Sequence, residues 1–272
     1  MQQWMIYGAN GYTGQLLARS AAQRGLRPIL AGRNRQTISA LANELNLPFR
    51  CFDLNRPQQI CEGLQDIQVV LHCAGPFSAT SGPMIDACLA AGCHYLDITG
   101  EIDVFVAAQQ RQADAEQAGI VLCPGVGFDV IPTDCIAARL KLALHDADRL
   151  ALGFDTHSSL SPGTARTSVE GLKYGGRVRK DDRIQTVPLA YQSREIDFGN
   201  GTKHAVTIPW GDIATAWFTT GIDDIEVFIP MAPSAAARLR RLDRFRALLG
   251  LAPVQALLKY LVGRRIQGPD HQ

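Results

Sequence analysis

Apolar and polar positions alternate along the first half of the chain in a regular succession of strand-like and helix-like segments. Short apolar runs predict six strands, at 5–7, 28–31, 50–52, 69–73, 94–98 and 120–123. Apolar residues spaced three and four positions apart predict helices between them, from Asn34, from Pro57, and at 13–24, 83–91 and 104–117. Strands that alternate with helices in this way predict an α/β fold with a doubly wound parallel (Rossmann) sheet.

The sequence also predicts the buried face of the first helix and the N-cap of the second. Leu16, Leu17 and Ala21 give the first helix one apolar face. Asn34 is expected to cap the second helix, because its side chain can accept a hydrogen bond from the first turn.

The pattern changes in the second half, where strand-like runs predominate. The segments 194–198 and 204–208 flank Gly199-Asn200-Gly201 and predict a hairpin. Further strands are predicted at 150–154, 213–219 and 225–229, and a helix is predicted to open at 161–164. We expect a second, α+β domain whose open sheet is covered on one face, with domain limits at 1–130 and 131–272.

Composition narrows the class of protein. The 272 residues are 46% hydrophobic, enough for a sizeable core, and a net charge of +1 gives no reason to expect a nucleic-acid partner. The seven cysteines are odd in number and lack metal-ligand spacing, so we expect a reduced compartment and no metal site. The chain begins with its first strand and has no run as long as a membrane span, which predicts a cytoplasmic protein without a signal peptide.

A glycine-rich turn, Gly8-Ala9-Asn10-Gly11-Tyr12-Thr13-Gly14, joins the first strand to the first helix. Glycines at this spacing permit a tight reversal, close approach of the backbone to a pyrophosphate, and close packing of helix on strand. The pyrophosphate is then expected on the N–H groups at the positive end of the helix. We interpret these residues as cofactor-binding; the alternative is a purely structural turn.

The residues after the second strand indicate which cofactor binds. An NAD site places a carboxylate there, whereas this chain reads Ala31-Gly32-Arg33-Asn34-Arg35. A guanidinium pairs with the oxygens of a 2′-phosphate, so the sequence favours NADP over NAD, with Arg33 and Asn34 in the site. Solvated arginines are the alternative. Asp53, after the third strand, is expected either to contact the adenine amino group or to hold a turn.

The end of the fourth strand carries Ala74, Gly75 and Pro76. Ligands of a doubly wound sheet lie over the carboxyl ends of its strands, so this rigid turn is expected near the ribose and nicotinamide. The alternative is a simple Gly-Pro turn.

Carboxylates follow the fifth and sixth strands at the same end of the sheet. Asp97 lies within the fifth strand, Glu101 follows it, and Asp129 comes after the glycine-rich exit of the sixth. Burying a carboxylate costs free energy unless the group has a partner or a task. We therefore predict Asp97, Glu101 and Asp129 as catalytic residues that polarise or protonate a substrate.

Together these motifs resemble the saccharopine dehydrogenase-like family of NADP-binding oxidoreductases, which includes the trans-acting enoyl reductases. The residues that carry the resemblance are 8–14, 31–34, 75–77, 94–101, 127–129, 208–212 and 220–227. It spans essentially the whole chain and implies a nicotinamide-dependent reductase or dehydrogenase with an N-terminal cofactor domain. Family members usually continue further, so we expect a truncated or shortened form whose second domain lacks its C-terminal end.

The sequence therefore predicts an NADP-dependent oxidoreductase, with cofactor binding at 1–130 and substrate binding or dimerisation at 131–272. Hydride is expected to pass between nicotinamide and a small-molecule carbonyl, imine or enoyl substrate bound between the domains. A short-chain dehydrogenase is disfavoured because no tyrosine has a lysine four residues on. A non-enzymatic NADP-binding sensor or scaffold protein is the alternative. Arg166 is either a contact to a substrate carboxylate or a solvated residue.

Basic and apolar residues are concentrated near the end of the chain. Residues 238–265 contain eight basic residues and one acid, Asp243, together with apolar stretches at 247–251 and 254–262. Helices of this kind lie in membrane interfaces with their arginines at headgroup level, so peripheral membrane contact is one expectation. A homodimer contact, interior packing and surface left bare by a missing C-terminal end are the alternatives.

Overall fold

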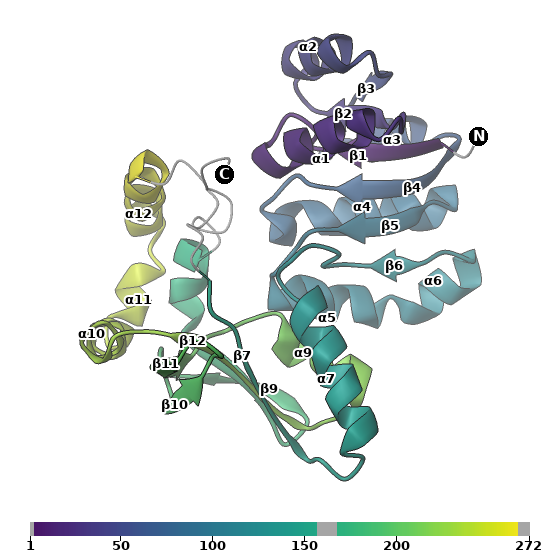
Figure 1. Ribbon diagram of the computed structural model, residues 1–272. Helices are drawn as coiled ribbons and strands as arrows, with labels where there is room; N and C mark the ends of the chain where they lie inside the picture. Colours follow the sequence, from purple (N-terminus) through teal and green to yellow (C-terminus); the bar gives the residue numbers. More distant parts are fainter. Residues whose placement is uncertain (1–2, 157–167, 266–272) are drawn as a thin grey trace. The chain divides into compact units, whose positions relative to one another are not determined.

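The computed structural model describes residues 3–156 and 168–265 of the chain (Figure 1). The chain divides between Asp129 and Val130 into two compact units, each with its own sheet. The separate roles expected for the two domains stay predictions. The helix expected to open at 161–164 and Arg166 both lie outside the described residues.

The first unit is built on a six-stranded parallel sheet in the order β3-β2-β1-β4-β5-β6. Its strands are β1 (Gln3–Tyr7), β2 (Ile29–Gly32), β3 (Phe49–Cys51), β4 (Ile67–His72), β5 (His94–Asp97) and β6 (Leu122–Cys123). This order is that of a Rossmann sheet, so the predicted fold class is confirmed. Ligands of such sheets bind where the strand order reverses, here outside the carboxyl ends of β1 and β4.

Helices cover both faces of this sheet (Figure 1). They are α1 (Tyr12–Gln23), α2 (Arg35–Leu45), α3 (Pro57–Gly63), α4 (Phe77–Ala91), α5 (Ile102–Gln110) and α6 (Gln112–Ala118). Side chains alternate along each strand, so Ile6 enters a cluster with Ala18 and Ile38 of α1 and α2, while Met5 and Tyr7 enter a second cluster on the other face.

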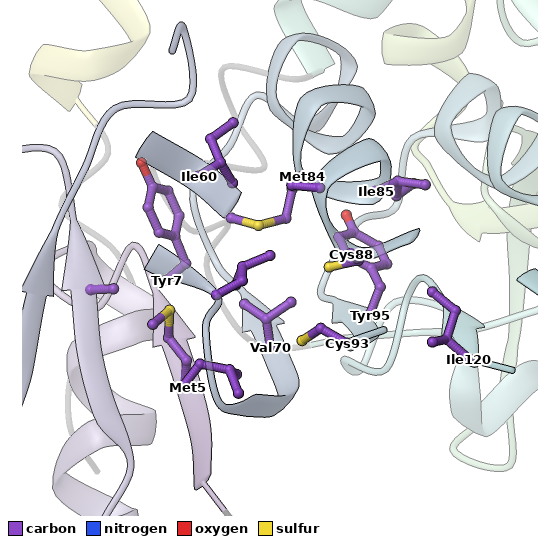
Figure 2. Close-up of a cluster of buried hydrophobic side chains, with 14 of the residues drawn as sticks. Met5, Tyr7, Ile60, Val70, Met84, Ile85, Cys88, Cys93, Tyr95 and Ile120 are labelled. Atoms are coloured by element: carbon purple, nitrogen blue, oxygen red, sulfur yellow. The ribbon is translucent and has the colours of Figure 1, made fainter. Parts of the chain in front are cut away.

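Figure 2 shows part of the second cluster, in which strand side chains meet α3 and α4. The labelled residues of these elements are Met5, Tyr7, Val70, Tyr95, Ile60, Met84, Ile85 and Cys88. Met84 and Tyr95 have no exposed surface. Burying a side chain of this size stabilises the fold by about 2 kcal/mol.

The helix predicted at 83–91 begins instead at Phe77 and contains Pro83 in its interior. Phe77, Ser81 and Met84 are buried along this helix. Proline cannot donate a backbone hydrogen bond. Burial of this face outweighs that loss, so the proline is not the start of the helix.

Two further predictions for this unit were wrong. The helix predicted at 104–117 is two helices that meet at Arg111, whose φ of −93° and ψ of 13° lie outside the helical range. Leu16, expected on the apolar face of α1, is 39% exposed. Small residues, Gly14, Ala18 and Ala21, form the buried face of α1 because the helix packs closely on the sheet.

The second unit contains a mixed sheet in the order β10-β11-β12-β8-β9, with β7 paired to β12. Its strands are β7 (Arg149–Gly153), β8 (Gly176–Lys180), β9 (Arg183–Val187), β10 (Ser193–Asp197), β11 (Thr202–Thr207) and β12 (Asp224–Pro230). Its helices are α7 (Ile131–Ala143), a 3-10 turn (Leu172–Tyr174), α9 (Asp212–Thr220), α10 (Pro233–Asp243), α11 (Arg246–Leu249) and α12 (Ala252–Arg265).

The predicted hairpin is confirmed as β10 and β11, and the strands predicted at 150–154 and 225–229 are β7 and β12. Leu150 and Leu152 are buried while their neighbours on β7 are exposed, so one face of this strand is covered, as predicted. The strand predicted at 213–219 was wrong, because α9 occupies it. The hairpin of β8 and β9 was not predicted.

Several apolar side chains in and between the helices α10, α11 and α12 are exposed. These are Leu242, Phe245, Leu248, Leu251, Leu257, Tyr260 and Leu261. Peripheral membrane contact and a homodimer contact both stay predictions for this surface. Across 3–156 and 168–265, we find no helix that is both long enough and apolar enough to span a bilayer.

Candidate cofactor and active site

The glycine turn lies where the strand order reverses, between the ends of β1 and β4. Gly8 has a φ of +80°, and a Cβ added to it would lie 2.8 Å from the backbone N of Ala74. The Gly8 N–H donates to the Ala31 carbonyl at 2.7 Å. Glycine tolerates both this left-handed conformation and the close neighbour. The turn therefore holds the ends of β1, β2 and β4 together.

Gly14 allows α1 to begin directly against this turn. A Cβ at Gly14 would lie 2.3 Å from the carbonyl oxygen of Gly8. The helix starts after Gly11, which makes no side-chain capping hydrogen bond. Its first turn, which includes Tyr12 and Thr13, contains no acidic residue. The N-terminus of α1 is therefore suited to an anion such as a pyrophosphate.

Ala9 and Asn10 connect the turn to β2. The Ala9 N–H donates to the Ala31 carbonyl at 3.1 Å. A Cβ added to Gly32 would lie 3.0 Å from Asn10 Oδ1, and Gln15 Nε2 donates to the Asn10 carbonyl at 2.9 Å. The turn is therefore held by β2 on one side and by Gln15 of α1 on the other.

The residues after β2 have distinct surroundings. Asn34 Oδ1 accepts from the Thr37 N–H at 3.2 Å, which confirms the predicted cap of α2. The Arg35 guanidinium lies over the Phe49 ring, 5.6 Å from its centroid. Arg33 is exposed, and its side chain makes no hydrogen bond or ion pair with the described residues. Arg33 is therefore the guanidinium of this segment that is available to a phosphate.

Asp53 holds the turn that follows β3. Its Oδ1 accepts from the backbone and side-chain N–H groups of Asn55, both at 2.9 Å. The buried Tyr7 hydroxyl donates to the Phe52 carbonyl at 3.0 Å. Burial, and next the Asp53 carboxylate, raise the pKa of Tyr7, whereas Arg33 opposes this shift. The ends of β1, β2 and β3 therefore share one electrostatic environment, and an adenine contact by Asp53 stays a prediction.

The turn after β4 is held by the hydroxyl of Thr80, a half-buried residue. The Gly75–Pro76 peptide is cis. Thr80 Oγ1 lies 2.7 Å from the Ala74 carbonyl oxygen, 3.0 Å from the Pro76 carbonyl oxygen and 3.0 Å from His72 Nε2. Burial lowers the pKa of His72 to about 3, so its ring is neutral near pH 7. Thr80 has one hydroxyl proton, so it can accept from His72 Nε2 and donate to the nearer carbonyl, that of Ala74, while the Pro76 carbonyl accepts from the Ala79 N–H at 3.1 Å.

Asp97 is completely buried and joins the ends of β5 and β6. Its Oδ2 accepts from the Tyr95 hydroxyl at 2.6 Å. Its Oδ1 accepts from the N–H groups of Thr99 and Gly125, at 2.9 and 2.8 Å. Burial raises the pKa of Asp97, and these hydrogen bonds partly oppose the shift. A carboxylate enclosed in this way connects loops and has no exposed surface for a substrate.

Glu101 caps the N-terminus of α4. Its Oε1 accepts from the Phe77 N–H and its Oε2 from the Ser78 N–H, both at 2.8 Å. A carboxylate at this position is stabilised by the free N–H groups and the positive end of the helix. Both carboxylate oxygens of Glu101 therefore already accept hydrogen bonds from the turn after β4.

Asp129 differs from the other two carboxylates. It is half-buried, and burial raises the pKa of its carboxyl group. A Cβ added to Gly100 would lie 2.6 Å from Asp129 Oδ2, so the carboxylate rests on the loop after β5. Of the three predicted catalytic residues, Asp129 combines access to solvent with a pKa shifted towards neutral.

Sequence reasoning missed His72, Thr80 and Gly125, which position the predicted residues. Thr80 has no local signature, because its partner Ala74 precedes the helix that carries it. Gly125 meets Asp97 across 28 positions of sequence. The contact between Gly125 and Asp97 depends on the pairing of β5 with β6 and cannot be identified from a local pattern.

These features define the first unit as a Rossmann-type dinucleotide-binding domain. Residues 4–123 match the family model of the saccharopine dehydrogenase NADP binding domain. The first unit is thus similar to that NADP-binding domain, so both the resemblance seen in the sequence and the predicted cofactor are confirmed.

Curated proteins show the same relationship. A trans-acting enoyl reductase of Mycobacterium ulcerans is 35% identical over 144 residues, which are 48% of this chain and 33% of that protein. A human saccharopine dehydrogenase-like oxidoreductase is 27% identical over 214 residues, 68% of this chain and 50% of that protein. The matches thus span only a third to a half of these relatives.

A solved structure shows a similar fold. The apo form of saccharopine dehydrogenase (L-Glu forming) from Saccharomyces cerevisiae matches with a TM-score of 0.62 and 13% identity, covering 89% of this chain and 57% of the yeast chain. At this identity the match describes the fold, a parallel sheet domain followed by a second domain with a largely antiparallel sheet.

Proposed function

We propose that the protein is an NADP-dependent oxidoreductase that transfers hydride between nicotinamide and a carbonyl, imine or enoyl substrate. The observation that carries this proposal is the glycine turn, in which Gly8 and Gly14 bring the N-terminus of α1 against the ends of β1 and β4. Relatives that are oxidoreductases by name support the reaction class.

In this proposal the chain's own residues bind and orient the dinucleotide. The first turn of α1 holds the pyrophosphate, and the exposed Arg33 pairs with the 2′-phosphate. Ala74, Gly75 and Pro76 face the nicotinamide end. When bound, the cofactor supplies or accepts the hydride.

Reduction of a carbonyl, imine or enoyl group requires a proton in addition to the hydride. We assign this proton to Asp129, because its raised pKa makes the protonated form available closer to neutral pH. Asp97 and Glu101 are not retained as proton donors, since their oxygens are engaged in holding the loops. A substrate position between the domains stays a prediction.

The cofactor assignment is tested by calorimetric titration with NADPH and, separately, NADH. Arg33→Ala should weaken NADPH binding about 10- to 100-fold, the cost of losing charged hydrogen bonds, and leave NADH binding unchanged. Arg24→Ala, which removes the same charge at the far end of α1, is the matched control. Equal loss for both cofactors would contradict the assignment of Arg33.

The reaction class is tested by oxidation of NADPH with panels of carbonyl, imine and enoyl compounds. Asp129→Asn should lower turnover about 100-fold while NADPH still binds. As a proton donor, Asp129 should make turnover fall as pH rises above its pKa, and the asparagine variant should lose that limb of the profile. Asp66→Asn, an exposed change in the same domain, is the control. NADPH binding without turnover on any compound would instead favour the sensor or scaffold alternative.

A further inference from the structure

The segment from Ala74 to Ser78 is held from two opposite directions. From the α4 side, Thr80 Oγ1 lies 2.7 Å from the Ala74 carbonyl oxygen and 3.0 Å from the Pro76 carbonyl oxygen. From the loop after β5, Glu101 accepts from the Phe77 and Ser78 N–H groups at 2.8 Å. Two carbonyl oxygens and two N–H groups of one short turn therefore lie within hydrogen-bond distance of side chains from outside it.

Glu101 is itself fixed in place. Its backbone N–H donates to Thr99 Oγ1 at 3.0 Å, and the Thr99 N–H donates to Asp97 Oδ1 at 2.9 Å. This chain of hydrogen bonds runs from the buried end of β5 to the start of α4. The position of Glu101 is thus set by the sheet and not by the exposed loop surface.

We propose that Glu101 is a positioning residue that sets the Ala74–Gly75–Pro76 turn for the nicotinamide end of the cofactor. The inference rests on the proposed function and adds a role that differs from proton transfer. By placing its carboxylate on the N-terminus of α4, Glu101 occupies the N–H groups that would otherwise attract a phosphate. The N-terminus of α1, which begins at the glycine turn, is then the site for the diphosphate.

The test compares two ligands that share only part of their structure. NADPH has a nicotinamide end, whereas adenosine 2′,5′-bisphosphate has only the adenosine with its 2′- and 5′-phosphates and lacks the nicotinamide half. Glu101→Gln keeps one acceptor oxygen but turns an amide N–H towards the second backbone N–H. We expect it to weaken NADPH binding about tenfold, to lower the fluorescence of bound NADPH, and to leave adenosine 2′,5′-bisphosphate binding unchanged.

One further variant tests the same turn from the α4 side, and another is a control on the surface. Thr80→Val keeps the side-chain shape, removes the hydroxyl and should give the same split between the two ligands. Glu62→Gln, an exposed change on α3, should alter neither binding constant. Retained binding of adenosine 2′,5′-bisphosphate in each variant also reports that the domain is folded.

Each outcome has a distinct meaning. A parent protein that fails to bind NADPH would overturn the proposed function, and the positioning role with it. A parent that binds NADPH while Glu101→Gln binds both ligands as tightly would overturn the positioning role alone. Equal weakening of both ligands would also overturn it, because the effect would then be on the whole site.

Discussion

At the scale of single residues, Asp97 is a buried acceptor for donors from β5, from the loop after β5 and from the loop after β6. Replacing it with alanine would leave the Tyr95 hydroxyl and the Thr99 and Gly125 N–H groups without this acceptor. Each such group costs about 1–3 kcal/mol, so Asp97→Ala should lower the free energy of unfolding by about 3 kcal/mol or more.

Urea unfolding measures this loss. Asp97→Asn is the matched control, because its amide oxygen still accepts both N–H bonds and its amide nitrogen can donate to the Tyr95 oxygen. The asparagine variant should therefore retain most of the stability that the alanine variant loses. A loss below about 1 kcal/mol in Asp97→Ala would contradict the role of this carboxylate as a connector.

His72 predicts a pH dependence of stability. Burial lowers its pKa from 6.5 to about 3 in the folded protein. Between these values the unfolded chain binds more protons, so the free energy of unfolding falls as pH drops below 6.5. At pH 5 this contribution amounts to about 2 kcal/mol, from 1.36 kcal/mol per pKa unit.

Denaturant unfolding of the parent and of His72→Gln at pH 7.5 and pH 5 tests the effect. Glutamine does not titrate and can still donate to Thr80, so the difference between the two pH values should shrink by about 2 kcal/mol. His145→Gln, an exposed change, should leave the difference as it is. The same pH difference in His72→Gln and the parent would show that His72 is not the source.

At the scale of elements, the contact between α1 and the glycine turn is decisive for the cofactor site. A Cβ at Gly14 would meet the Gly8 carbonyl oxygen at 2.3 Å, and a backbone atom cannot rotate away. Gly14→Ala should therefore displace α1 and weaken NADPH binding more than about tenfold. Gly82→Ala is the control, since its Cβ would have open space within α4 and alanine favours helices. Calorimetry on both variants checks the prediction, and unchanged affinity in Gly14→Ala would contradict it.

Element prediction succeeded where a local pattern decides the structure. The strands β1 to β5 and the start of α2 follow from apolar runs and from Asn34 as a cap. The strand prediction for 213–219 was wrong. The β-branched and aromatic residues of this segment favour a strand, but Ile213, Ala216 and Thr220 are buried on one face of the helix α9. Asp212 in the first turn and Gly221 after the last were the local signals for a helix.

In the candidate site, too, the features set by local sequence were predictable and the contacts between distant residues were not. The glycine turn was predictable because its requirement for small residues is local. The positions of Asp97 and Glu101 at the carboxyl edge were also predictable, but their partners were not, since Phe77 lies 24 positions from Glu101 in sequence. Whether a carboxylate caps a helix or faces a substrate depends on such distant partners.

At the scale of the whole molecule, the first unit has a self-contained core. Both of its apolar clusters are made of residues between Trp4 and Leu122. We therefore expect residues 1–129 alone to fold cooperatively and to bind NADPH within about threefold of the full chain, because the proposed cofactor contacts all precede residue 77. Denaturant unfolding and calorimetry of this fragment test the expectation. A fragment that unfolds without cooperativity would show that the second unit is needed for folding.

Glu101 also affects how this edge of the sheet responds to dissolved ions. Inorganic phosphate, sulfate and free nucleotides are attracted to helix N-termini that lack a counter-ion. At α4 the counter-ion is part of the chain, so its effective concentration is set by geometry and not by the medium. Dialysis or a change of buffer cannot remove it. The preference of a diphosphate for the N-terminus of α1 over that of α4 is therefore set by the covalent structure of the domain.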